Sequence, residues 1–439
     1  MKAFPEGFLW GAATSAYPTE GGGFDSDWWR WEQRPGRIRD GSSAKFAGGL
    51  YECFEDDLDL MRKLGYRAYL FSLEWSRIQP ARGLFDESAI THYHAVFDGL
   101  ASRGIEPVCV LHHVSLPAWL AARGGWAHPR AARLFGQYAE RVAAEYAGRC
   151  RWWIPILEPM HALNMAYVER IWPPASANLP RAVRALRNLV RAHGSAYQAL
   201  HARQPEAMVG VSVRGRVFAP LDADRAWDLR TARREQRRCN HWFPEAVQRG
   251  GLLPWRRRRS GGQGPFDFLA LSYYGSERIR FSAVRPFRLF SQTVAPEGKA
   301  LRHAEPTPDS AGLESLIDEM GSYGVPILIA GNGVAADDDR VRCRFLLDHV
   351  ATLERRIEKG ADVQGYFYYA LLDGFEWAEG LSPRYGLIHV DQASLARTPN
   401  PSAYLYKDIC ENNGLRAGVL ARFCPGWRAP ADRTEAVAP

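Results

Sequence analysis

The sequence predicts a single (β/α)₈ barrel, and three observations support this prediction. Short apolar or aromatic runs recur along the chain, and there are eight of them. Amphipathic stretches, in which apolar residues return every three or four positions, lie between the runs. No linker or break in composition divides the 439 residues, a length that barrels with long loops commonly reach. Eight strands that alternate with helices are the pattern of this fold.

Each predicted strand is a run that leads into polar or small residues. In chain order the runs are FLWGAATSAY (8–17), AYLFSLEW (68–75), PVCVLHHV (107–114), WWIPILEP (152–159), MVGVSVRGRVF (208–218), FDFLALSYY (266–274), PILIAGNG (326–333) and GYFYYALLDGF (365–375). Helical spacing predicts helices at YECFEDDLDLMRKLG (51–65), AITHYHAVFDGLASRG (89–104), PRAARLFGQYAERVAAEYAG (129–148) and DRVRCRFLLDHVATLERRIEKG (339–360). We expect one barrel over residues 1–415 and a C-terminal tail over residues 416–439. The last stretch of the tail, PGWRAPADRTEAVAP (425–439), is rich in Pro, Ala and charge, and we expect it to be frayed.

The composition is that of a soluble globular protein, with 46% hydrophobic and 24% charged residues. The net charge of +7 comes from scattered arginines and one dense run, Arg256 to Arg259, which we interpret as a solvated loop without a function. The seven cysteines form no metal-binding spacing, so we expect a reduced chain with no metal and no cofactor. No signal peptide or long apolar run is present. We therefore expect a cytoplasmic protein with a small-molecule substrate and with no nucleic-acid or membrane partner.

The active site of such a barrel lies at the carboxyl ends of its strands. The residues predicted at those ends include many aromatic, histidine and glutamate side chains: Tyr17, Glu20, Glu74, Trp75, His112, His113, Glu158, Arg214, Tyr273, Tyr274, Gly331, Asn332, Glu376 and Trp377. A ring of such residues is suited to binding a polyol.

Several motifs resemble those of glycoside hydrolase family 1, the retaining β-glycosidases. They are FPEGFLWGAATSAYPTEGG, AYLFSLEWSRI, LEP after WWIPI, WPP at residues 172–174, FDFLALSYY and YALLDGFEWAEGLSPRYGLIHVD, and they run in order from about Phe4 to about Asn413. The resemblance implies two carboxyl groups about 5 Å apart, one an acid/base and the other a nucleophile. It assigns the acid/base to Glu158 of LEP, where the family has NEP.

The same resemblance places the nucleophile in an ENG motif at the end of the seventh strand. This chain has GNG there, so Gly331 stands at the nucleophile position. The next acids, Asp337 to Asp339, match a separate family feature at the start of the following helix. We therefore expect the nucleophile to be absent, and we expect Gly331 to lie within about 10 Å of Glu158 in one pocket with Glu376.

Other positions that the resemblance assigns to the sugar have also changed. A sugar-binding Gln is Pro18, an Arg beside the nucleophile is Leu70, an Asn that binds the 2-hydroxyl is Leu157, a strand-three HWD reads His113, Val114, Ser115, and a Trp platform is Tyr369. Retained at family positions are His113, Glu376 and Trp377, assigned to the sugar, and Tyr274, assigned to contact with the nucleophile. The losses favour a substrate less polar than glucose, because an unpaired hydroxyl costs about 1–3 kcal/mol.

Three functions stay open from the sequence. In the first, Glu158 acts as a general acid or base without a nucleophile, and a lone carboxyl beside Leu157 would favour its neutral, proton-donating form. The reaction would be hydrolysis, glycosyl transfer or acid-catalysed rearrangement of a sugar-like, secondary-metabolite-type molecule. In the second, the chain only binds a glycoside or another small molecule. In the third, it is an ordinary retaining β-glucosidase with an engineered glycine at Gly331, or with Glu74 or Glu376 as a relocated nucleophile.

Overall fold

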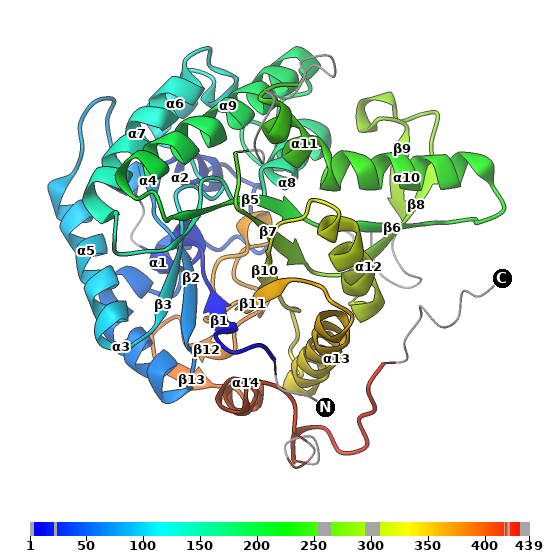
Figure 1. Ribbon diagram of the computed structural model, residues 1–439. Coiled ribbons are helices and arrows are strands. Elements are labelled where there is room, and N and C mark those ends of the chain that lie inside the picture. The colour runs from blue at the N-terminus through cyan, green and yellow to red at the C-terminus, as the bar shows by residue number, and fades with distance from the viewer. Residues whose placement is uncertain are drawn as a thin grey trace.

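The computed structural model describes residues 4–21, 24–252, 265–294, 308–416, 418 and 422–430. Eight parallel strands in this part of the chain close into a barrel, in the order β1-β11-β10-β7-β5-β4-β3-β2 (Figure 1). They are β1 (Leu9–Ala13), β2 (Ala68–Ser72), β3 (Glu106–Val110), β4 (Trp152–Ile154), β5 (Met208–Arg214), β7 (Phe268–Tyr273), β10 (Ile327–Asn332) and β11 (Val363–Tyr369). Each overlaps one of the eight predicted runs, with β3 and β11 beginning one and two residues before theirs, so the predicted (β/α)₈ barrel is confirmed.

The barrel closes where the first strand meets the last. Strand β1 pairs with β2 on one side and with β11 on the other, so that Gly11 lies opposite both Ala68 and Phe367. A side chain at residue 11 would meet the Ala68 carbonyl and the Phe367 ring, which explains a glycine there. Because all eight strands are parallel, their carboxyl ends meet at one rim of the barrel.

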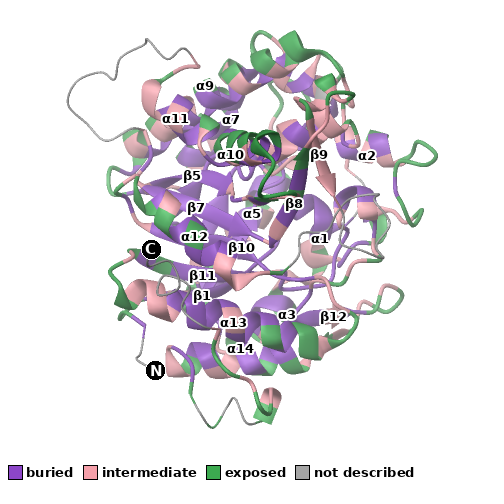
Figure 2. Ribbon diagram, turned by 90° about the vertical axis from the view of Figure 1, so that its right-hand side faces the viewer, coloured by how far each residue is buried: buried purple, intermediate pink, exposed green. Residues whose placement is uncertain are grey.

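Helices surround the strands, and their exposed faces form the outside of the molecule (Figure 2). The longer ones are α3 (Leu50–Lys63), α5 (Glu87–Ser102), α7 (Ala131–Tyr146), α9 (Leu179–Arg203), α11 (Trp242–Arg249), α12 (Ser310–Gly321), α13 (Asp339–Glu358) and α14 (Pro401–Asn412). Side chains cap several amino ends: Asp86 accepts from Ser88 and Ala89 in α5, and Asp338 accepts from Arg340 in α13. Such caps satisfy amide groups that have no partner inside the helix.

The interior of the barrel is a separate apolar core that rises to the rim. Its buried side chains come from alternate positions of the strands and include Val108, Val110, Ile154, Phe268, Leu328 and Phe367. Leu70, Leu157 and Ala330 belong to the same cluster near the carboxyl ends of the strands. The floor beneath the rim is therefore apolar.

A small layer of strands and one helix projects from the side of the barrel (Figure 1). It consists of strands β6 (Val217–Pro220), β8 (Ser276–Phe281) and β9 (Ser291–Val294) and helix α10 (Ala226–Asn240). The predicted run 208–218 thus supplies two strands, because Gly215 and Arg216 separate β5 from β6. A further pair, β12 (Ile388–Val390) and β13 (Arg397–Pro399), lies outside the barrel.

Part of the predicted frayed stretch is docked on the barrel, so that prediction is wrong for residues 425–430. The indole of Trp427 donates to Asp348 of α13 at 2.7 Å, and Arg355 donates to the carbonyl of Pro430 at 3.1 Å. The tail carries an aromatic anchor, which its composition did not reveal. Residues 431–439 and the run Arg256 to Arg259 lie outside the described residues. No described helix is long and apolar enough to cross a membrane.

Candidate functional site

A pocket opens at the carboxyl ends of the strands, where the fold predicts the site. It encloses about 60 Å³, and its lining comes from every part of the rim: Ala13, Thr14, Ser15, Leu70, His113, Leu157, Glu158, Arg214, Ser272, Tyr274, Ala330, Tyr369, Glu376, Trp377 and Tyr385. Nine residues that the sequence placed at the site are in this list. They are Leu70, His113, Leu157, Glu158, Arg214, Tyr274, Tyr369, Glu376 and Trp377.

Glu158 lies at the turn between β4 and the short helix α8 (Pro159–Leu163). Its backbone is left-handed, with φ 49°, and its amide donates to Ser212 Oγ at 3.0 Å, which fixes the turn. The carboxylate is 5% exposed and accepts from Arg214 Nη1 at 3.1 Å. The sequence predicted a lone carboxyl in apolar surroundings, and this is wrong. Arg214, at the end of β5, supplies a charged partner.

Arg214 also contacts Tyr274. The guanidinium lies 4.4 Å from the centre of the tyrosine ring, a distance at which the cation and the ring attract each other. This arrangement holds the cation between Glu158 and Tyr274. The sequence placed Arg214 at the rim but gave it no role, because nothing in the run MVGVSVRGRVF indicates where the side chain points.

Gly331 lies in β10 and is screened from the pocket. A Cβ at this position would stand 2.8 Å from the hydroxyl of Tyr274 and 3.3 Å from Ser272 Oγ. Both of these neighbours line the pocket, whereas Gly331 itself does not. The prediction that Glu158, Gly331 and Glu376 line one pocket therefore holds for the two glutamates and is wrong for Gly331, because the Tyr274 hydroxyl fills the space beside it.

Glu376 is the second carboxyl group of the pocket. Both of its oxygens accept from the Tyr369 hydroxyl, each at 3.3 Å. Burial raises the pKa of Glu376 to about 8, with Asp373 and Glu158 adding to the increase, while Tyr369 and Arg214 oppose it. At neutral pH Glu376 therefore mostly carries a proton.

Two further predicted residues form a rigid side of the pocket. His113 bonds through Nδ1 to the hydroxyl of Ser15, and burial together with the nearby Arg214 lowers the pKa of His113 to about 3. This imidazole is neutral at pH 7. The Trp377 ring stacks on Tyr17 with ring centres 5.9 Å apart. The His113 ring lies edge-on to Trp377, with ring centres 5.4 Å apart.

Leu70 and Leu157, which stand at positions that the family resemblance gives to polar residues, lie in the lining of the pocket together with Ala330. Pro18 does not join them. It is buried in helix α1 (Ala16–Glu20), and its carbonyl accepts from the amide of Phe375 at 2.8 Å. Ser15, Ser272 and Tyr385 line the pocket without having been predicted, since a serine or a tyrosine beyond a strand carries no distinctive sequence signal.

A wider cleft of about 370 Å³ lies outside this pocket and shares Arg214, Tyr274, Glu376, Trp377 and Tyr385 with it. Its walls include residues 161–172 on one side and residues of β8, β9 and their connection on the other. In the described part of the chain, no group of three or more His, Cys, Asp or Glu side chains is arranged to hold a metal ion.

Comparison with known proteins gives consistent results. The family model described as "Glycosyl hydrolase family 1" matches residues 1–415. Beta-glucosidase A of Thermotoga maritima is 30% identical, over 94% of this chain and 99% of that protein. Thermostable beta-glucosidase B of Thermobispora bispora is 32% identical, over 95% of this chain and 92% of that protein.

Solved structures agree with these matches. A beta-glycosidase from Pyrococcus horikoshii superimposes with a TM-score of 0.87 at 32% identity, and 96% of this chain and 98% of that chain are covered. A beta-glucosidase from Thermotoga maritima in complex with deoxynojirimycin superimposes with a TM-score of 0.88 at 29% identity, with 95% and 100% covered.

Proposed function

Because the chain belongs to glycosyl hydrolase family 1, we propose that it is an enzyme that acts on a glycoside or sugar-like molecule, with Glu158 as general acid or base. Relatives with β-glucosidase names, and neighbours solved with deoxynojirimycin or castanospermine, support a small glycoside-like ligand. We assign the activity to residues 1–415, the span of the family match, and treat residues 416–439 as an appendage.

The observation that carries the proposal is the glycine at residue 331 of β10, where the family resemblance places a carboxylate. By its family resemblance, Gly331 occupies the position of the nucleophile, and the Tyr274 hydroxyl fills the space where a side chain would begin. A covalent glycosyl-enzyme therefore has no attachment point at residue 331. We propose that the reaction proceeds by direct attack of water or another acceptor, or by rearrangement, rather than through a relocated nucleophile.

Tyr274 is a poor substitute for the lost nucleophile. Burial and the charge of Glu158 raise the pKa of the Tyr274 phenol well above its usual range, although Arg214 opposes this effect. The group therefore stays protonated at neutral pH. A phenol of this kind donates hydrogen bonds but does not attack a sugar carbon.

Two carboxyl groups with different environments remain in the pocket. Glu158 is ion-paired with Arg214, while Glu376 is protonated near neutral pH and touches the Tyr369 hydroxyl. Direct displacement needs one proton donor for the leaving oxygen and one acceptor for the proton of the attacking water. Glu376 can supply the first proton and Glu158 can receive the second. The total number of protons on the protein is therefore the same before and after the reaction.

The apolar floor bears on the substrate. Leu70, Leu157 and Ala330 offer no hydrogen bonds, and burying a sugar hydroxyl against them would cost about 1–3 kcal/mol. We propose a substrate with fewer hydroxyl groups than glucose at this floor, such as a secondary-metabolite glycoside. Hydrolysis, transfer and rearrangement all remain compatible with the same pair of carboxyl groups.

Turnover of 4-nitrophenyl β-D-glucopyranoside and of less hydroxylated aryl glycosides tests the proposal. We expect slow release of nitrophenol by the wild type, with faster release from the deoxy-sugar substrates. Glu158→Gln should lower kcat/KM by about 10²- to 10⁴-fold. Exposed Glu140, on the outer face of α7, provides the control variant Glu140→Gln, which should match the wild type. Unchanged turnover in Glu158→Gln would move the acid–base role to another residue. If the wild type and all variants bound the glycosides normally and converted none of them, the protein would be a glycoside-binding protein and not an enzyme.

A further inference from the structure

An aromatic row lies on the layer that projects from the barrel, in segments that follow the pocket residues Arg214 and Tyr274 in the chain. Trp227, in the first turn of α10, contacts Phe281 of β8 at 5.3 Å between ring centres, and Phe281 stacks with Phe290 at 6.2 Å. Trp227 is 55% exposed, Phe290 is 42% exposed, and Val284, in the connection between these phenylalanines, is 87% exposed. The row thus places large apolar groups in solvent, which a stable surface normally avoids.

The exposed face of α10 is cationic. Arg230, Arg233, Arg234 and Arg237 are exposed and, like Trp227, fall within about one third of the helix circumference. The Arg230 guanidinium lies 5.5 Å from the centre of the Trp227 ring. Within the described residues, no carboxylate forms an ion pair with Arg230 or Arg233.

The carboxylates of this layer are turned inward. In α10 and in residues 276–294 together, nine arginines accompany three carboxylates, and all three carboxylates are buried: Asp228, Glu235 and Glu277. Asp222 and Asp224, in the turn before α10, offset part of the resulting positive charge.

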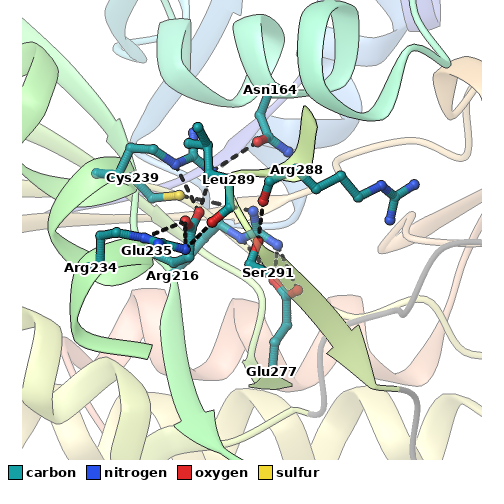
Figure 3. Close-up of polar contacts among 10 residues, drawn as sticks. Asn164, Arg216, Arg234, Glu235, Cys239, Glu277, Arg288, Leu289 and Ser291 are labelled. Atoms are coloured by element: carbon teal, nitrogen blue, oxygen red, sulfur yellow. Dashed lines mark hydrogen bonds and ion pairs between the residues drawn. The ribbon is translucent and has the colours of Figure 1, made fainter. Parts of the chain in front are cut away.

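A polar network holds the buried acids in place (Figure 3). Glu277 accepts from Arg216 through both oxygens at 2.6 Å, and Glu235 accepts from Arg234 at 3.2 Å. Arg234 also donates to the carbonyl of Leu289, which ties α10 to the segment that carries Phe290. The network therefore presents the arginines and the aromatic row on one rigid layer.

Against the sequence expectation of no membrane partner, we infer that this projecting face docks on an anionic lipid surface, with Trp227, Val284 and Phe290 in the headgroup region and the α10 arginines against acidic headgroups. Tryptophan is favoured at the membrane–water interface, and an arginine near an anionic surface contributes about 1 kcal/mol, or roughly fivefold in partitioning. A cytoplasmic chain would meet such headgroups on the inner leaflet. This inference is independent of the proposed catalytic role of Glu158.

The aliphatic tip favours lipid over nucleic acid as the partner. Single-stranded nucleic acid stacks its bases on aromatic rings, and the exposed side chain of Val284 has no ring on which a base could stack. Arg285 and Arg288, which follow Val284, line the outer cleft. A docked protein would therefore present the entrance of the cleft close to the lipid surface.

Flotation with vesicles of phosphatidylcholine, with or without 30% phosphatidylglycerol, tests the inference on the full chain. We expect binding only to the anionic vesicles, weakened by salt. Arg230→Glu/Arg233→Glu should reduce partitioning at least about tenfold, and Trp227→Ala should reduce it several-fold. The matched controls are Arg184→Glu/Arg187→Glu, a pair with the same spacing and exposure on α9, and Trp242→Ala, a tryptophan that is 45% exposed on α11.

The controls should bind like the wild type, and circular dichroism should show that all variants are folded. Absence of binding to anionic vesicles would overturn the inference. Equal binding by Arg230→Glu/Arg233→Glu and the wild type, or equal binding to neutral vesicles, would do the same. The protein could instead bind single-stranded DNA and not vesicles, in a salt-sensitive way that Arg230→Glu/Arg233→Glu abolishes. In that case the partner of the projecting face would be nucleic acid and not lipid.

Discussion

Placing a carboxylate at residue 331 of β10 should not produce a normal glycosidase. In Gly331→Glu the new Cβ would stand 2.8 Å from the hydroxyl of Tyr274, so the tyrosine must move. Tyr274 is held beneath Arg214 at 4.4 Å and edge-on to Tyr369 at 5.9 Å between ring centres. Overpacking of this kind costs roughly 1–3 kcal/mol of unfolding free energy. The displaced ring would also disturb the Arg214–Glu158 pair.

The new carboxylate would lack a charged partner of its own. Leu70 stands where the resemblance places an arginine, and a buried carboxylate without a partner takes up a proton instead of ionising. The sugar contacts that the resemblance places at residues 18 and 157 would still be absent, at about 1–3 kcal/mol each, or roughly 30-fold in rate or more for the two.

Kinetics with 4-nitrophenyl β-D-glucopyranoside and thermal unfolding measure both effects. We expect Gly331→Glu to stay at least roughly 30-fold below a family β-glucosidase and to unfold at a lower temperature than the wild type. Gly331→Ala adds only the Cβ and so separates the effect of moving Tyr274 from the effect of the new carboxylate. The double variant Gly331→Glu/Leu70→Arg should be more active than Gly331→Glu alone. Rates typical of the family from Gly331→Glu alone, with unchanged stability, would refute the reasoning and indicate an isolated, engineered glycine.

Three other predictions concern titration and the tail. Because Glu376 must be protonated to act as an acid, activity should fall as pH rises through about 8. In a pH–rate profile, Glu376→Gln should abolish this alkaline fall in activity. An unchanged fall in the variant would mean that another group causes it. Burial raises the pKa of Glu74 to about 7, so its contribution to stability is complete below about pH 4.5 and is lost as pH rises through 7, by about 3 kcal/mol. In denaturant titrations, the free energy of unfolding of the Glu74→Gln variant should differ less between pH 5 and pH 8 than that of the wild type. The same difference in both proteins would contradict the assignment to Glu74. Trp427→Ala removes the bond to Asp348 and should lower the melting temperature and expose the tail to proteolysis, whereas an unaffected variant would show that the docking adds nothing.

The barrel could be predicted from the sequence because its determinants are local. A run such as FDFLALSYY is apolar over a strand's length and is followed by polar residues, and each such run became a strand. The division of run 208–218 into β5 and β6 was missed, since both strands are equally apolar in sequence. The docking of residues 422–430 was missed as well, because it depends on a single hydrogen-bonded tryptophan.

The site could be predicted only in part, because its electrostatics depend on contacts between distant segments. Sequence patterns placed Glu158, Glu376 and Tyr274 at the rim, and all three line one pocket. The pairing of Glu158 with Arg214 joins the ends of two different strands, so nothing near Glu158 in the sequence reveals it. The proton of Glu376 likewise follows from burial, which a motif does not specify.

The stereochemistry of the product most directly tests the claim that the chemistry proceeds without a nucleophile at Gly331. A long incubation of the wild type with 4-nitrophenyl β-D-glucopyranoside in aqueous methanol yields a methyl glucoside whose anomeric form does not equilibrate and is read by proton NMR. Direct displacement with Glu158 and Glu376 predicts methyl α-glucoside, formed by inversion, and its loss in Glu158→Gln. Accumulation of methyl β-glucoside would mean retention through a covalent intermediate on another residue, and would contradict the account.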